Sequence, residues 1–178
     1  MTDIRPASGT LGVLTPGMGA VATTFYSGVF AVRKGLAKPF GSLTQLGHIR
    51  LGKRTEGRNP FIRDFVPLAS LEDLVFGGWD PIPDDAYAAA RRAGVLTPED
   101  LGGIREELTA ITPMPAVFSH DWVKLLTGTT NVKTGHSTMD LAEQLMADIE
   151  RFRRERRCDR VVMVWCGSTE AYHTPAAV

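Results

Sequence analysis

The stretch from Thr10 to Ala22, TLGVLTPGMGAVA, constrains this chain more than any other part of its sequence. The apolar run LGVL is followed at once by a proline, two glycines and several small residues. This order predicts a buried strand that breaks into a tight turn and then opens a helix. Gly17, Gly19 and Ala22 fit G-x-G-x-x-A, the fingerprint of a dinucleotide-binding turn.

Each small residue of the fingerprint has a physical reason. Gly17 has no Cβ and therefore permits the tight turn. Gly19 lets the backbone approach a pyrophosphate, and Ala22 lets the new helix pack closely on the strand. The free N–H groups and the dipole of that helix then face the negative charge of the phosphates. A single fingerprint is not specific, so the rest of the sequence has to support it.

Hydrophobic patterning along the chain predicts an alternation of strands and helices. This alternation implies an α/β fold, a Rossmann-like parallel sheet with helices on both faces. The expected strands are 10–15, 71–80, 115–118 and 160–166, and the expected helices are 19–34, 84–94, 97–111 and one that starts after Ser137 and includes residue 152.

Three expectations concern burial. The run 160–166 is almost continuously apolar, which is typical of a strand that helices bury on both faces. Asp148 is expected on the polar side of the last helix. The first helix is expected to bury a stripe of apolar residues at helical spacing, namely Val21, Phe25, Val29 and Val32.

Residues 1–9 are expected to form a flexible leader, and 10–178 a single dinucleotide-binding domain. Residues 37–67 show no strong periodicity, and thirty such residues inside a compact domain need an explanation. The simplest is a surface insertion between the first helix and the second strand.

Composition excludes several kinds of partner. The 178 residues carry a formal net charge of zero, so nucleic acid is not an expected partner. No apolar run is long enough to span a bilayer, so no membrane partner is expected either. Cys158 and Cys166 form neither a disulfide framework nor a metal-ligand pattern, so we expect no metal and a cytoplasmic location.

Three turns follow three of the expected strands, at 16–21, 77–80 and 166–169. Parallel strands bring their carboxyl ends to one edge of a sheet, where ligands bind. Asp80 could accept hydrogen bonds from an adenosine ribose and repel a 2′-phosphate, which favours NAD over NADP. The usual spacing from the glycines is about 20 residues, so Asp80 requires the insertion; otherwise it forms only an Asx-turn before Pro81.

Several segments together resemble the N-terminal part of the inositol-3-phosphate synthase family, also called myo-inositol-1-phosphate synthase. The resemblance runs from about Leu11 to the end of the chain. That family carries an insertion that explains the long spacing between Gly19 and Asp80. The matching segments are LGVLTPGMGA, FGSLTQ followed by LG, LVFGGWDP, MPAVF and DRVVMVWCGSTEAY.

The resemblance implies a tightly bound NAD and glucose 6-phosphate as substrate. The reaction would be an internal oxidation, an aldol cyclisation and a reduction that give inositol 3-phosphate, in a protein that is a homo-oligomer, a tetramer, when complete. The implied cofactor residues are Gly17, Met18, Gly19, Ala20 and Val21 for the pyrophosphate, Asp80 for the adenosine ribose, Val117 on the adenine side, and Cys166, Gly167, Ser168 and Thr169 along the cofactor beyond it.

The sequence also departs from the family pattern. Ala20-Val21 stands where eukaryotic members have paired asparagines in a longer loop, so the loop would contact the cofactor through its backbone. The catalytic lysines of the family belong to a second half that these residues do not include. The catalytic residues are therefore unassigned, and we expect the chain alone to be inactive. Two alternatives stay open: a non-catalytic NAD-sensing module and an ordinary NAD-dependent dehydrogenase.

Overall fold

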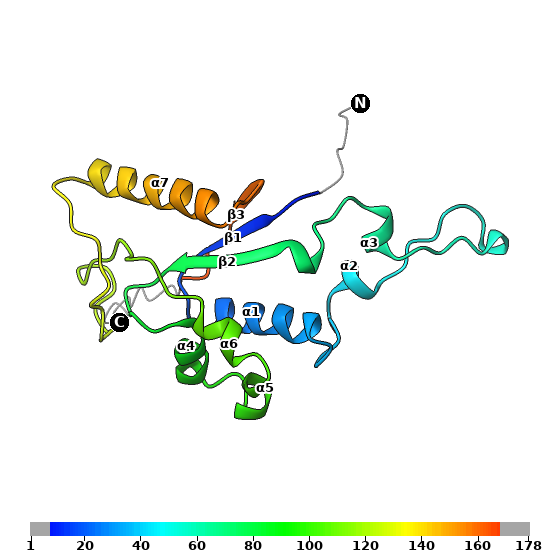
Figure 1. Ribbon diagram of the computed structural model, residues 1–178, viewed down its shortest axis with the longest axis horizontal. Coiled ribbons are helices and arrows are strands. Elements are labelled where there is room, and N and C mark those ends of the chain that lie inside the picture. The colour runs from blue at the N-terminus through cyan, green and yellow to red at the C-terminus, as the bar shows by residue number, and fades with distance from the viewer. Residues whose placement is uncertain (1–7, 168–178) are drawn as a thin grey trace, which may run out of the picture.

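A three-stranded parallel sheet in the order β2-β1-β3 forms the centre of the computed structural model, which describes residues 8–167 (Figure 1). The central strand β1, Leu11–Pro16, pairs with β2, Leu74–Trp79, on one side and with β3, Arg160–Met163, on the other. The predicted α/β class with a parallel sheet is confirmed. The helices are α1 (Ala20–Arg33), α2 (Leu43–Leu46), α3 (Ile62–Phe65), α4 (Ala86–Ala93), α5 (Pro98–Gly102), α6 (Arg105–Thr109) and α7 (Thr138–Glu155), with 3₁₀ turns at Arg54–Glu56 and Leu71–Asp73.

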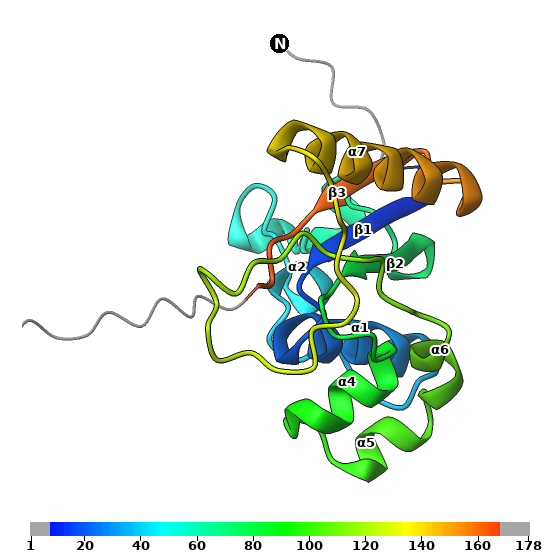
Figure 2. The ribbon, with the colours of Figure 1, turned by 90° about the vertical axis from the view of Figure 1, so that its left-hand side faces the viewer.

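Helices cover both faces of the sheet. α7 lies on one face, and α1, α4 and α6 lie on the other (Figures 1 and 2). Successive strand residues point to opposite faces, so Val13 and Phe76 join Tyr26 in one core cluster, while Leu14 and Trp79 join the α7 side in the other. The sheet therefore separates two distinct cores.

The buried face of α1 differs from the predicted stripe. Val21 is 66% exposed and Phe25 is 42% exposed, and of the four predicted residues only Val29 is fully buried. The helix instead turns small side chains toward the sheet, which brings the two backbones close together. Tyr26 packs on this face of the sheet, where its hydroxyl contacts the Thr15 hydroxyl. The residues that α1 buries are Ala22, Thr23, Tyr26, Ser27 and Val29.

The helix predicted over 97–111 is two short helices, α5 and α6. Its start is as expected, because Thr97 and Asp100 form a reciprocal capping box. The helix then ends at Gly102 and is interrupted at Gly103 and Ile104, since glycine is a poor helix former. Leu101 and Leu108 are nevertheless buried, so the predicted apolar face survives the break.

The strand predicted over 115–118 is not formed. The backbone makes two isolated parallel bridges instead, Met114 with Trp79 and Ala116 with Val132. Pro113 and Pro115 flank Met114 and lack the N–H groups that a continuous ladder needs. The segment still runs beside the end of β2, where it closes the site described below.

The last strand is not buried on both faces, contrary to the prediction. Val161 packs toward α7, but Val162, Met163 and Trp165 are largely exposed. β3 is an edge strand, and the core cluster on the face opposite α7 contains no residue from Arg160–Met163. An apolar run therefore indicated a strand here, but not its surroundings.

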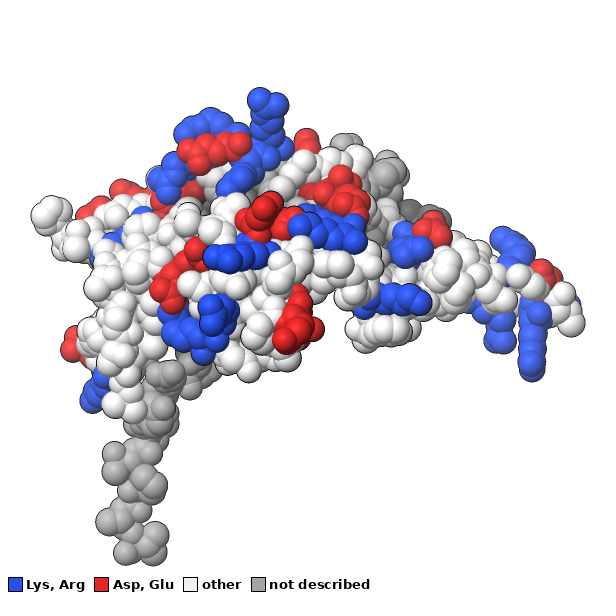
Figure 3. Space-filling model, turned by 60° about the horizontal axis from the view of Figure 1, so that its bottom comes forward, with Lys and Arg blue, Asp and Glu red and all other residues white. Residues whose placement is uncertain are grey.

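Residues 37–67 project away from the sheet, on the side opposite the carboxyl ends of the strands (Figure 1). Their two branches run antiparallel, with a bridge between His48 and Phe61. Lys and Arg side chains gather at the far end of this projection, while the rest of that face mixes both signs (Figure 3). Most of the expected leader lies outside the described residues. Of the helices in residues 8–167, none has both the length and the hydrophobicity that a membrane span requires.

Candidate dinucleotide site

The turns after all three strands meet at the carboxyl end of β1. The Gly17 amide donates to the Trp79 carbonyl at 2.8 Å, which joins the glycine turn to the end of β2. The Cys166 amide donates to the Pro16 carbonyl at 2.9 Å, which joins the turn to the segment after β3. The predicted convergence of the three turns is therefore seen in the hydrogen bonds.

The two glycines of the fingerprint do different work. Gly17 has φ +89°, and a Cβ there would lie 2.7 Å from the Gly167 nitrogen, so no other residue fits without a shift. Gly19 is the N-cap of α1 at φ −82°, and a Cβ there would meet nothing within 4 Å. Gly19 has no side chain that could cap the first turn of α1, so the amides of this turn lack the usual cap. Gly17 shapes the turn, and Gly19 keeps the approach to it clear.

Asp80 binds the glycine turn directly. Its Oδ2 accepts a hydrogen bond from the Met18 amide at 2.7 Å, although the two residues lie 62 positions apart. Its Oδ1 accepts from the Ile82 amide at 2.9 Å, which is the Asx-turn considered as the alternative. A carboxylate offers about four acceptor positions, so about two remain beyond these hydrogen bonds. The Asx-turn and a ligand role are thus compatible.

The backbone of Asp80 is also fixed. The Asn131 side-chain amide donates to the Asp80 carbonyl at 2.9 Å, and the Asp80 amide donates to the Met114 carbonyl at 3.3 Å. Asn131 was not predicted as part of the site, because the irregular segment around it shows no periodicity that would place it at the sheet. This contact explains how a loop far along the chain supports the candidate carboxylate.

Asp148 is buried, contrary to its expected place on a polar helix face. Its Oδ2 accepts from the Trp79 indole N–H at 2.9 Å and lies 2.8 Å from Lys133 Nζ, and its Oδ1 lies 2.6 Å from an Arg151 nitrogen. Burial opposes ionisation, but the hydrogen bonds from Lys133 and Trp79 outweigh it and lower the pKa of Asp148. The spacing held a usable signal, because positions 145, 148 and 152 share one helix face.

The other predicted residues lie around the same edge. Met18 is fully buried, whereas Ala20 and Val21 are exposed beside the start of α1. Val117 is exposed next to the bridge at Ala116. Cys166 is partly buried, and burial raises the pKa of its thiol. Ser168 and Thr169 lie outside the described residues.

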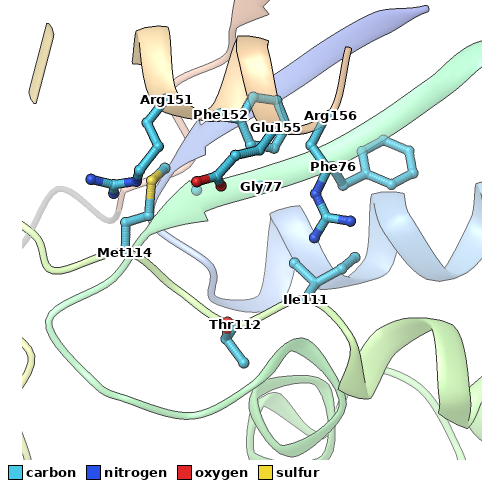
Figure 4. Close-up of a pocket in the computed structure, with 10 residues that line it drawn as sticks. Phe76, Gly77, Ile111, Thr112, Met114, Arg151, Phe152, Glu155 and Arg156 are labelled. Atoms are coloured by element: carbon cyan, nitrogen blue, oxygen red, sulfur yellow. The ribbon is translucent and has the colours of Figure 1, made fainter. Parts of the chain in front are cut away.

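A separate cavity of about 150 Å³ runs along the outer edge of β2 (Figure 4). Met114 and α7 close it, with Arg151, Glu155 and Arg156 at its rim. Ligand pockets usually occupy about 300–1,000 Å³, so this cavity is too small for a dinucleotide. In residues 8–167, no three His, Cys, Asp or Glu side chains come together as a metal site would need.

Comparison with known proteins now gives this geometry a family. The family model of the NAD-binding domain of myo-inositol-1-phosphate synthase matches residues 11–178. The chain belongs to this family. It is 51% identical to inositol-3-phosphate synthase 1 of Bacteroides thetaiotaomicron over 96% of its length, and 34% identical to inositol-3-phosphate synthase 1 of rice over 94%.

A solved structure agrees with the family assignment. The crystal structure of inositol-3-phosphate synthase from Caenorhabditis elegans matches 93% of this chain with a TM-score of 0.81 and 27% identity. The chain spans 39% of the length of the Bacteroides relative and 35% of the nematode chain. The resemblance proposed from the sequence is therefore confirmed, for the portion of the family that contains the NAD-binding domain.

Proposed function

We propose that this chain is the NAD-binding part of an inositol-3-phosphate synthase, which converts glucose 6-phosphate to inositol 3-phosphate. The observation that carries the proposal is the hydrogen bond from the Met18 amide to Asp80. It brings the turn suited to a pyrophosphate and the carboxylate suited to a ribose to the same edge of the sheet. Membership of the synthase family supplies the reaction.

The residues present suit NAD. The amides of residues 19–21, which have no side-chain cap, and the open space at Gly19 form a cradle for a pyrophosphate. Asp80 has acceptor positions left for the ribose hydroxyls, and its charge disfavours a 2′-phosphate. Val117 would lie on the adenine side, and the segment from Cys166 to Thr169 would line the cofactor beyond the pyrophosphate. NAD, when bound, supplies a reversible hydride acceptor.

Several finer assignments belong to this proposal. Residues 10–178 would act as one NAD-binding unit in which 37–67 is an insertion. The complete protein would be an isomerase, a cytoplasmic homo-oligomer, with its catalytic groups outside these residues. The chain alone would not turn over glucose 6-phosphate. Production of inositol phosphate by the purified 178-residue chain would contradict this last point.

The NAD site is tested by substituting two glycines, Gly19 at the start of α1 and Gly28 in its middle. A Cβ at Gly19 or at Gly28 meets no atom within 4 Å, so both positions have room for a side chain to begin. Gly19→Val should weaken NAD binding at least tenfold by titration calorimetry, because the valine occupies the proposed pyrophosphate space. Gly28→Ala should bind NAD as the wild type does. Absence of NAD binding by the wild type, or unchanged binding by Gly19→Val, would refute the site.

The alternatives differ in what happens to the sugar. With the rest of its polypeptide present, a synthase converts glucose 6-phosphate without net formation of NADH. A dehydrogenase accumulates NADH, which absorbance reports directly. A sensing module binds NAD and leaves the sugar unchanged.

A further inference from the structure

One short loop holds the end of β2 by two different side chains. Asn131 binds the carbonyl of Asp80, and Lys133, two residues later, binds Asp148 on α7. Asp148 in turn accepts the indole N–H of Trp79, the residue just before Asp80. The loop and α7 therefore hold two consecutive residues, Trp79 and Asp80, at the end of β2.

The ion pair at the centre of this arrangement is buried. The side chain of Lys133 is 9% exposed and that of Asp148 is 3% exposed. Desolvation of two charges offsets much of their attraction, so a buried pair adds little net stability over an apolar pair. Its clearest physical effect here is to fix the direction of the Asp148 carboxylate, and with it the indole of Trp79.

Trp79 links the Asp148 carboxylate to the glycine turn. Its carbonyl accepts from the Gly17 amide at 2.8 Å, and the next residue, Asp80, accepts from the Met18 amide. A displacement of Trp79 therefore changes both hydrogen bonds that align the turn with the carboxylate.

We propose that Asp148 and Lys133 are positioning residues for the cofactor site, which act through Trp79 to hold Asp80 against the glycine turn. The proposal rests on the proposed function, because it takes Asp80 as the ribose-binding group. Asp148 binds both Lys133 and the indole of Trp79, and the effect of the pair on NAD is carried by Trp79.

The test uses the 178-residue chain, with two readouts taken well below its unfolding temperature. One is hydrogen exchange at the Met18 amide without NAD, and the other is the dissociation constant for NAD. Asp148→Asn and Lys133→Met should each speed Met18 exchange and weaken NAD binding, both at least tenfold. Lys133→Arg keeps the charge and should retain most of the protection of the Met18 amide and most of the NAD affinity.

Lys34→Met is the matched control. It also removes a lysine–carboxylate pair, Lys34 with Glu107, but at the other end of α1. It should leave Met18 exchange and NAD affinity unchanged. If Asp148→Asn and Lys133→Met behave like Lys34→Met in both readouts, the positioning role is wrong.

A double variant guards against loss of folding in the single ones. Lys133→Met with Asp148→Leu replaces both charges by apolar groups, which restores stability in comparable pairs. It leaves the Trp79 indole without its acceptor, so NAD affinity should stay at least tenfold weaker; wild-type affinity would overturn the proposal.

Asp80→Asn separates the ribose assignment from the positioning role. Unchanged NAD affinity in Asp80→Asn refutes the ribose assignment, whereas a loss seen there but not in Asp148→Asn refutes only the positioning.

Discussion

The two strands that flank β1 look alike in the sequence and differ in the structure. β2 and the run that contains β3 are both short and largely apolar. β2 is almost wholly buried, with a core on each face and a fixed carboxyl end. β3 is largely exposed, because only the α7 side covers it within the described residues.

This difference separates the formation of a strand from its burial. β-branched and apolar residues favour an extended backbone in both places. Burial depends on which layers the rest of the chain supplies, and the chain supplies two for β2. A precise binding geometry at the end of β2 is possible because Trp79 and Asp80 are held from several sides. Four predictions test this contrast, from the largest expected effect to the smallest.

The sharpest comparison is between two tryptophans. Trp79 is 4% exposed and Trp165 is 76% exposed. Trp79→Ala should lower the free energy of unfolding by about 4 kcal/mol, because it leaves a cavity and removes a buried hydrogen bond to Asp148. Trp165→Ala should change it by less than about 0.5 kcal/mol. Urea denaturation measures both, and equal losses would remove the contrast between the two strands.

The second comparison uses pH. Asp148→Asn should cost about 3 kcal/mol at pH 7, because it removes the charge that pairs with Lys133. The pKa of Asp148 is lowered from its ordinary value of 3.8, so this stability is present above that value and is lost as the pH falls further. The gap between wild type and variant should therefore narrow from about pH 4 downward. A gap that stays constant down to pH 2 would show that the charge is not the cause.

The third substitution tests the turn that joins both strands. Gly17→Ala places a methyl group 2.7 Å from the Gly167 nitrogen at a positive φ. We expect a loss of about 2 kcal/mol in thermal or urea unfolding, from backbone strain and the forced shift. A stable Gly17→Ala variant would mean that the segment after β3 is not packed on the turn.

The smallest effect is expected on β3. Val162 is an exposed strand residue, while its register partner Val13 on β1 is buried. Val162→Thr should change the free energy of unfolding by less than about 0.5 kcal/mol, because its hydroxyl stays in water. Val13→Thr should cost about 1–3 kcal/mol, because it buries a hydroxyl in the core. A similar loss at both positions would indicate that Val162 is covered after all.

The sequence predicted the parts of the fold that depend on local pattern. The strands β1 and β2, the helix starts at Asp85, Thr97 and Ser137, and the parallel pairing of the strands all follow from periodicity and capping. The buried stripe of α1 was misjudged, because small residues and one tyrosine pack there in place of the larger apolar ones.

The candidate site was predictable only in part, for a physical reason. A glycine-rich turn and an acid at a strand end are local signals, so the glycines and Asp80 could be proposed from the sequence. Asn131 and Lys133 come from an irregular loop whose path depends on tertiary contacts. Asp148 was misplaced because a charged residue was assumed to face water, although its spacing put it on the apolar side of α7.

The hydrogen bond between Met18 and Asp80 also explains why counting residues misleads at this site. The number of residues between the glycine fingerprint and the acidic residue reflects only the length of the segment that connects them. Here residues 37–67 project from the opposite edge of the sheet and return (Figure 1), and the Met18 amide still lies 2.7 Å from Asp80 Oδ2. A longer or shorter insertion would leave this contact unchanged.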